Sequence, residues 1–250
     1  MTRTVAALRA EWIKAVTLRS TWASLLAYAV VVLGIGLAVL ASVGAAEAAS
    51  PDYDPGTIAF YGLNFGHVAV IVLAVLLTAG EYGQRLIHTS LVAVPDRGRF
   101  LAAKITVGAC LVLVAAGVTA PATVLATQAL IGSPGVTFGT PGMVRATVAA
   151  VLYPTLLAVI CMAVGMMARD SAGALTVLVP FFFLVSPLLE LVPVLQRFAV
   201  FLPDRAGAIA VRLNSRPIDV FGPVTGLAVL AAWAAVAVLA AWWVLRRRDA

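Results

Sequence analysis

Charged residues are scarce in this sequence, and so are cysteine and lysine. Only 11% of the 250 residues are charged, whereas 62% are hydrophobic; soluble domains are about one quarter charged. This composition excludes a soluble enzyme and a disordered protein, and two cysteines are too few for a disulfide-stapled secreted domain. A net charge of +6 would suggest nucleic-acid binding only if a soluble domain carried a basic face. The sequence has no such domain, so nucleic acid is not an expected partner. The composition predicts an integral membrane protein.

Motifs for nucleotide binding and hydrolysis are missing as well. There is no Gly-x-x-x-x-Gly-Lys-Ser/Thr phosphate loop, no His-Glu-x-x-His zinc motif and no Gly-x-Ser-x-Gly nucleophile turn. Cys110 and Cys161 lie in apolar runs without metal-ligating neighbours, so we expect both to be free thiols that fill space. The chain itself is expected to be no enzyme and to bind no cofactor or metal.

What the sequence does contain is six apolar runs of membrane-spanning length, about 20 residues or more each. They predict an all-α polytopic membrane protein, a single domain of residues 1–250, with spans near residues 22–44, 58–79, 101–130, 143–168, 172–195 and 222–245. Lysine and arginine concentrate at the cytoplasmic ends of spans. Twelve of them lie on the side of the N-terminus and five on the other, so we expect both termini in the cytoplasm.

The segment before the first span, residues 4–21, has helical periodicity. Apolar and charged side chains occupy opposite faces, with Val5, Leu8, Trp12 and Val16 on one and Arg3, Glu11 and Lys14 on the other. Tryptophan beside basic residues is typical of a helix that lies in the membrane interface. We predict such a helix here; the alternative is an ordinary positively charged lead-in to the span.

The cytoplasmic loop at residues 80–100 predicts a short amphipathic helix. Glu81 and Arg85 have the i, i+4 spacing that stabilises helices, and Leu91 is among the apolar side chains that no soluble domain of this chain could cover. A turn at residues 95–98 separates this helix from the third span. The helix could dock into a groove of a partner protein or rest on lipid headgroups, and the residue pattern leaves both open.

The segment at residues 196–220, between the last two spans, is too apolar for a flexible loop and too charged to cross a membrane. We expect short helices that dip into the outer leaflet, with breaks at Pro203 and Pro217. The fifth span contains Pro180 and Pro187, so it should bend or break near its outer end.

Few polar side chains lie within the predicted spans. Asn64 and His67 are in the outer half of the second span, and Glu190 is near the outer end of the fifth. A lone histidine is more often a hydrogen-bonded helix contact than a catalytic group. The carboxylate is expected to pair with an outer arginine rather than to relay protons. Gly62 and Gly66 have the spacing that permits close helix approach.

Three stretches of the sequence carry a family pattern. They are Arg9-Ala10-Glu11-Trp12-Ile13-Lys14 with residues 17–22, the loop residues Glu81, Tyr82, Arg85, Thr89, Val94, Pro95, Arg97 and Lys104, and the ending at residues 242–249. Together they resemble permease subunits of the ABC transporter type 2 family, especially actinobacterial ones. The likeness extends over the whole chain in length, number of spans and charge layout.

This resemblance implies half of a transporter. Two permease chains, identical or homologous, would pair in the lipid bilayer with two separate ATP-binding subunits, which would hold ATP and Mg²⁺. The coupling contacts would lie on Trp12 and on the loop residues Glu81, Tyr82, Arg85, His88, Leu91 and Arg97. The loop departs from the family pattern at His88, and the turn of Arg169, Asp170 and Ser171 is too short to expect a second coupling contact there.

The resemblance also implies a function. The expected activity is export, across the plasma membrane, of a hydrophobic or amphipathic compound such as an antibiotic, drug, peptide or lipid. Its path would run along the interface of the permease chains, lined by the second and fifth spans, with Asn64, His67 and Glu190 as possible polar contacts. Two alternatives stay open: a membrane scaffold or sensor subunit, and a lipid-modifying enzyme, for which these three polar residues would have to converge.

Overall fold

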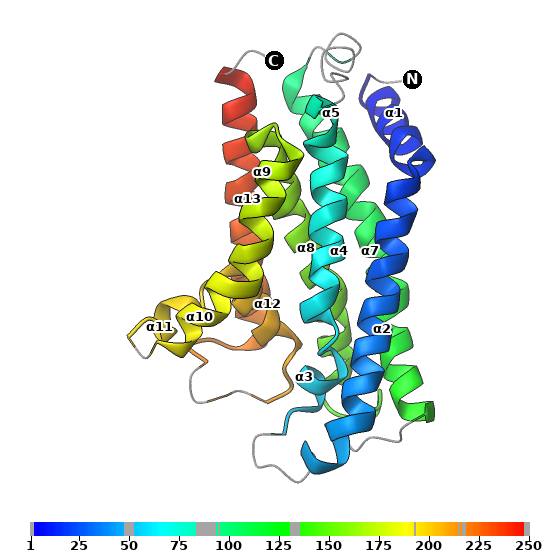
Figure 1. Cartoon of the computed structure of the whole chain (residues 1–250), viewed down its shortest axis with the longest axis vertical. Helices are drawn as coiled ribbons and strands as arrows, with labels where there is room; N and C mark the ends of the chain where they lie inside the picture. Colours follow the sequence, from blue (N-terminus) through cyan, green and yellow to red (C-terminus); the bar gives the residue numbers. More distant parts are fainter. Residues whose placement is uncertain are drawn as a thin grey trace.

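The computed structural model of the chain describes residues 3–47, 53–83, 94, 96–130, 136–192, 194–214, 216 and 219–247, and in these ranges all regular secondary structure is helical. Five helices are long and apolar enough to cross a membrane, the second of them together with the short α5 that follows it. They are α2 (Arg19–Glu47), α4 (Leu63–Thr78), α7 (Arg97–Leu130), α8 (Met143–Ala168) and α13 (Pro223–Arg247). Figure 1 shows them standing side by side as one bundle, which indicates a membrane protein.

Shorter helical elements lie between and beside the long ones. They are α1 (Arg3–Thr17), α3 (Pro55–Ala59), α5 (Gly80–Gly83), α9 (Ser171–Pro180), the π-helix η1 (Phe181–Val185), α10 (Ser186–Leu191), α11 (Gln196–Ala199) and α12 (Pro203–Val211). Both ends of the chain and α5 lie at one end of the bundle, and α3, α10, α11 and α12 lie toward the other (Figure 1). The termini therefore share one end; that this end faces the cytoplasm stays a prediction.

The fifth predicted span, residues 172–195, is not a straight helix. α9, η1 and α10 follow one another without a gap, and their apolar part, Ser171–Val185, is shorter than the five long helices. The π-helix begins directly after Pro180, and a π-turn bends a helix because its hydrogen bonds skip a residue. Beyond it, α10 and α11 turn away from the bundle (Figure 1). The predicted bend is confirmed, and a sixth crossing by this segment stays a prediction.

The segment at residues 196–220 contains short helices, as expected. α11 and α12 are separated by a turn, and Pro203 occupies the first turn of α12, where its missing N–H costs nothing. Pro217 lies outside the described residues. Whether these helices dip into the outer leaflet stays a prediction.

Close packing of α4 on α2 depends on two glycines. A Cβ atom on Gly62 would collide with the backbone carbonyl of Val32, and one on Gly66 would collide with the Val32 side chain. Tyr28 and Val32 are both buried in this contact. The close approach that the glycine spacing permits is present in the structure.

The N-terminal helix α1 does not pack on the bundle with the apolar face that was predicted from Val5, Leu8, Trp12 and Val16. The buried residues of α1 are Ala7, Glu11 and Ala15. Leu8 and Val16 pack partly on the core, but Val5 and Trp12 are exposed. Glu11 thus lies on the buried face of α1, because its partner Lys104 lies there.

Candidate functional site

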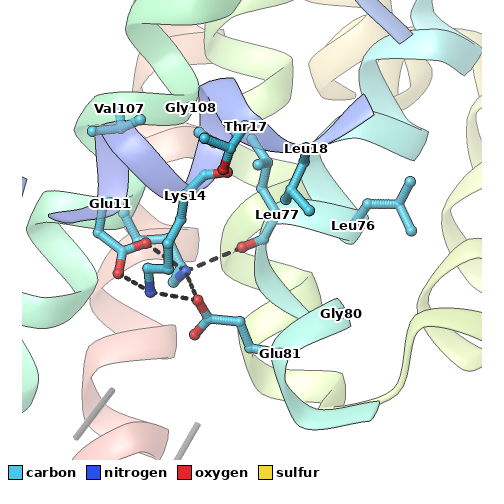
Figure 2. A pocket seen from close by; sticks show the side chains of 12 residues that line it. Glu11, Lys14, Thr17, Leu18, Leu76, Leu77, Gly80, Glu81, Val107 and Gly108 are labelled. Atoms are coloured by element: carbon cyan, nitrogen blue, oxygen red, sulfur yellow. Dashed lines mark hydrogen bonds and ion pairs between the residues drawn. The ribbon is translucent and has the colours of Figure 1, made fainter. Parts of the chain in front are cut away.

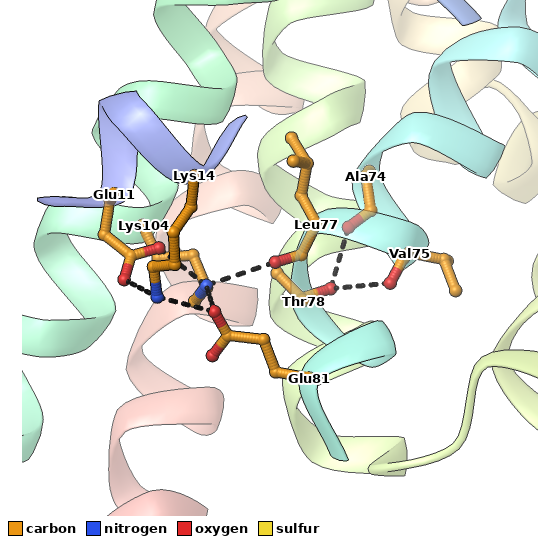
Figure 3. A network of polar contacts seen from close by, with 8 residues as sticks. All are labelled: Glu11, Lys14, Ala74, Val75, Leu77, Thr78, Glu81 and Lys104. Carbon is orange, nitrogen blue, oxygen red and sulfur yellow. Dashed lines mark hydrogen bonds and ion pairs between the residues drawn. The ribbon is translucent and has the colours of Figure 1, made fainter. Parts of the chain in front are cut away.

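Both lysines of the chain meet two acids in one cluster at the end of the bundle that holds the termini. Glu11 and Lys14 come from α1, Glu81 comes from α5, and Lys104 comes from α7 (Figure 3). We call these four side chains the inner charge cluster. It joins segments that are 23 to 93 residues apart in the sequence.

Lys104 is the centre of the inner charge cluster. Its Nζ donates to Glu11 Oε2 at 2.7 Å, to Glu81 Oε1 at 2.8 Å and to the backbone carbonyl of Leu77 at 3.2 Å. These three acceptors use all three donors of an ammonium group. Lys14 Nζ adds a bond to Glu81 Oε1 at 2.7 Å and an ion pair with Glu11. The two positive and two negative charges balance within the cluster.

Burial makes this pairing necessary. The side chain of Lys104 is 4% exposed, that of Glu11 9% and that of Glu81 11%, whereas Lys14 is 39% exposed. The Phe100 ring covers one side, with its centroid 5.2 Å from Lys104 Nζ. A buried charge without a partner costs several kcal/mol, so each of the three buried groups depends on the others.

Lys14 is held in its charged form by the two acids. Burial lowers the pKa of this lysine, but the hydrogen bonds and charges of Glu11 and Glu81 outweigh that effect and raise its pKa above the usual value. The group lies in α1, outside the helices long enough to span a membrane. Lys14 therefore stays positive at any physiological pH and closes the exposed side of the cluster.

A cavity of about 150 Å³ opens beside the inner charge cluster, between α1, α4, α5 and α7 (Figure 2). Leu18 lies at its edge, where α1 ends and the chain turns into α2. Glu81 uses one oxygen, Oε1, for both lysines, while Oε2 is buried and has no partner among the described residues. The inner charge cluster therefore borders an unfilled cavity where α1 meets the bundle.

The other predicted coupling residues do not join this cluster. Tyr82 lies under Arg169, whose guanidinium carbon is 5.5 Å from the ring centroid, so the short turn after α8 contacts α5. Arg97 Nη1 donates to the carbonyl of Leu245 at 2.7 Å and ties α7 to the end of α13. Trp12 is exposed and lines a separate hollow between α1 and α7. The predictions for Arg85, His88 and Leu91 lie outside the described residues.

Sequence reasoning found Glu81 but missed its partners. Lys104 had been counted as a charge at the start of the third span, and Glu11 and Lys14 as the polar side of an interfacial helix. The sequence did contain a signal for Lys104, one of only two lysines, because it lies inside an apolar run. An ionisable group in such a place needs a buried partner of opposite charge. Which acid would meet it could not be deduced from spacing, since the partners come from three separate elements.

A second polar site lies toward the other end of the bundle. A cavity of about 360 Å³ is lined by Asn64, Phe65, His67, Tyr153, Phe182, Phe183, Asp204, Arg205 and Ala208. These residues come from α4, α8, η1 and α12. We call this space the outer pocket. It brings together two of the three predicted polar contacts, Asn64 and His67, whereas the side chain of Glu190 is not among those described.

Charges in the outer pocket are neutralised locally. Ser186 Oγ lies 2.7 Å from each carboxylate oxygen of Asp204, and Arg205 Nε lies 3.1 Å from Oδ2. Burial raises the pKa of Asp204 above its usual value, although Ser186 and Arg205 work against this shift. The pocket therefore offers aromatic walls and hydrogen-bonding edges without an unbalanced charge.

His67 does not make the hydrogen bond expected of a lone histidine in a helix contact. Its ring packs edge-on against Tyr153 with 4.4 Å between centroids, and its buried Nε2 has no partner among the described residues. Tyr153 instead donates to the backbone carbonyl of Asp204 at 2.8 Å. Within the described part of the chain, no carboxylate forms a hydrogen bond with this imidazole.

Neither site has the ligands of a metal centre. No group of three His, Cys, Asp or Glu side chains capable of holding a metal occurs in the described ranges, and Cys110 and Cys161 are free. Comparison with known protein families finds no family model that matches the chain, and comparison with curated proteins finds no similar sequence. Function is therefore inferred from the two sites themselves.

Proposed function

We propose that the chain is the membrane-spanning permease subunit of an ATP-driven ABC exporter in the plasma membrane. It would cross the membrane six times with both termini in the cytoplasm, pair with a second permease chain, identical or homologous, and bind two ATP-binding subunits. Its cargo would be a hydrophobic or amphipathic compound. The chain would perform no catalysis, and ATP and Mg²⁺ would be held by the partner.

The inner charge cluster is the observation that carries this proposal. It fastens α1, α5 and α7 to one another at the end of the bundle where the segment at residues 80–100 begins and ends. A force applied to that segment by a partner would reach α5 first and would pass through Glu81 to Lys104 and Lys14. Ion pairs between side chains of separate helices suit such a task, because they keep the helices together while their angles change.

The outer pocket supports a cargo of mixed polarity. Phe65 and Phe183 lie with ring centroids 6.1 Å apart, and they give the pocket an aromatic wall. Asn64, His67 and the neutralised Asp204 give it polar edges without net charge. A pocket of this kind binds flat or amphipathic molecules by apolar contact and discriminates weakly among them.

The first test is the partner itself. The tagged protein is extracted in mild detergent from its native membrane, and the preparation is assayed for a co-purifying ATPase. A stoichiometric ATP-binding subunit supports the proposal. A stable preparation that contains no ATPase contradicts it and favours the scaffold or sensor alternative.

The second test addresses coupling. In the assembled complex, Glu81→Gln should keep the ATPase bound but reduce its stimulation by cargo, since Lys104 and Lys14 lose their charged link to α5. Asp96→Asn is the matched control, because this exposed acid of the same loop forms its hydrogen bonds, among the described residues, to its neighbours Gly98 and Arg99 and does not contact the inner charge cluster. Equal stimulation in both variants would remove the coupling role of Glu81.

The topology can be tested separately in a variant whose two native cysteines are replaced by alanine. A cysteine at Asp52 should react with a membrane-impermeant reagent in intact cells, and one at Asp96 should not. The reverse pattern would overturn the orientation without bearing on the ATPase partner.

A further inference from the structure

A groove lies between the first turns of α7 and the last turns of α13, away from both sites described above. Its volume is about 380 Å³, and it is lined by Gly98, Leu101, Ala102, Val238, Leu239 and Trp242. An adjoining hollow of about 400 Å³ shares Val238 and Leu239 and continues along α13 to Ala234. From Trp242 to Ala234 the helix rises about 12 Å. The two hollows form one apolar trough of the length and polarity that suit an acyl chain.

Positive charge gathers at the mouth of this trough. The guanidinium of Arg246 stacks on Trp242, a lining residue of the trough, 4.1 Å from the ring centroid. That of Arg247 stacks on the neighbouring Trp243 at 4.4 Å, beside the trough rather than in its lining. Both arginines are exposed. Stacking holds the flat face of a guanidinium and leaves its N–H edge directed outward, which is the edge that binds phosphate oxygens.

The one acid described at this mouth is already engaged. Asp96 Oδ1 accepts hydrogen bonds from the backbone N–H of Gly98 and Arg99 at 3.0 and 3.1 Å, and Oδ2 lies 3.4 Å from Arg99 Nη2. Asp96 also attracts Arg246 electrostatically, but within the described part of the chain no carboxylate lies within ion-pair distance of Arg246 or Arg247. Among the described residues, Arg99 and Arg246 thus outnumber the single acid at this mouth.

We infer that the α7–α13 groove binds an anionic phospholipid, with one acyl chain in the trough and the phosphate at Arg246, next to which Arg247 adds positive charge. Basic side chains at the end of a membrane helix attract anionic headgroups, by about fivefold in affinity for each arginine. Trp242 lies where the trough meets the charges, a position typical of tryptophan at the membrane interface. The apolar trough and the charged mouth match the two parts of one lipid molecule.

The test uses a lipid that reports its own contact with Trp242. Purified protein is placed in phosphatidylcholine vesicles that contain a small share of lipid with brominated acyl chains, either phosphatidylglycerol or phosphatidylcholine. Bromine quenches the fluorescence of a tryptophan that it touches, and the Trp242→Phe variant gives the signal of the other four tryptophans. We expect Trp242 to be quenched at a lower share of brominated phosphatidylglycerol than of brominated phosphatidylcholine.

Three variants separate a built site from general surface charge. The double variant Arg246→Gln/Arg247→Gln should lose the preference for phosphatidylglycerol. The double variant Arg3→Gln/Arg19→Gln removes as much charge from exposed positions on α1 and α2 and should keep it. Ala102→Phe fills the groove, keeps every charge, and should weaken quenching of Trp242 by both lipids.

Two results would overturn the inference. Equal quenching of Trp242 by the two brominated lipids would show that the headgroup is not recognised. Equal loss of the preference in both double variants would show that only the net charge of the protein matters. Either result leaves the ATPase partner and the transport role untouched, because none of these side chains belongs to the inner charge cluster or the outer pocket.

Discussion

The two ends of the bundle are both held by charged side chains, but in different ways. At the end with the termini, which we call the inner end after its charge cluster, lysines and acids from α1, α5 and α7 bind one another. At the opposite end, which we call the outer end after its pocket, side chains reach across the fold mainly to backbone groups. Asp54 Oδ2 accepts from the N–H of Leu213 and Asn214 at 2.8 and 2.6 Å, and Arg145 donates to the carbonyls of Ala210, at 2.8 Å, and Arg212.

This difference bears on which end can move. A bond between two long side chains tolerates a change in the angle between helices, because both side chains can follow. A bond to a backbone group fixes the position of a loop, because the backbone has far less freedom. The outer end does contain ion pairs, Asp204–Arg205 and Arg212–Asp219, but each joins residues of the same local segment. The inner end is thus joined mainly by pairs of long side chains, and the outer end mainly by bonds to backbone groups.

The largest expected effect comes from removing the central charge of the inner cluster. Lys104→Met leaves Glu11 and Glu81 buried with half of their partners gone, and we expect a loss of about 3–5 kcal/mol in unfolding free energy. The measurement is thermal unfolding of the purified protein in detergent. Lys14→Met is the matched control, with a much smaller loss because this lysine is partly exposed.

A double variant decides whether the loss reflects unpaired charge. Glu81→Gln/Lys104→Met removes one charge of each sign and should be more stable than Lys104→Met alone, since fewer unpaired acids stay buried. If the double variant loses the sum of the two single losses, the side chains act independently and the comparison between the ends fails.

The sequence predicted the elements of this fold better than the contacts between them. The apolar runs predicted the five long helices, the prolines predicted the bend that follows Pro180, and the glycine spacing permitted the contact at Gly62, because each signal is local in the chain. The inner charge cluster and the outer pocket could not be deduced, since their members are brought together by helix packing. Asp204 in particular carried no local mark that it would meet Ser186 and share a cavity with His67.

The next effect tests the backbone contacts of the outer end. Asp54 accepts from the N–H of Thr57, at 2.7 Å, as the N-cap of α3, and from two N–H groups near residue 213. Asp54→Ala leaves these buried donors unpaired, and we expect a loss of about 2–3 kcal/mol in thermal unfolding. Asp54→Asn keeps one acceptor oxygen and should lose about half as much. Equal losses would show that charge, rather than acceptor geometry, holds this end.

A smaller effect is expected at the outer pocket, and it should depend on pH. The pKa of Asp204 is raised in the folded state, so this acid gives the fold its greatest stability below its usual pKa of about 4, and stability falls as pH rises through the raised pKa. Ser186→Ala removes a donor to the carboxylate and raises that pKa further. We expect a loss of about 1 kcal/mol at neutral pH that disappears in acid.

Thermal unfolding at several pH values measures this loss. Ser42→Ala is the control, because among the described residues this exposed serine donates to carbonyls of its own helix, and the variant should show no pH dependence. A loss in Ser186→Ala that is the same at every pH would mean that the hydroxyl supports packing rather than the carboxylate.

The smallest effect concerns the exposed edge of the inner charge cluster. The pKa of Lys14 is raised above its usual 10.5 in the folded state, so its contribution to stability is complete below that pH and is lost as pH rises through the raised value. The unfolding temperatures of the wild type and of Lys14→Met should therefore differ at neutral pH and converge in alkali. Arg9→Gln is the control, since arginine keeps its charge throughout and its difference from the wild type should not close. Convergence in Lys14→Met alone would show that the inner end is held by charge, as the contrast with the outer end requires; a constant difference would assign Lys14 to packing and make the two ends alike.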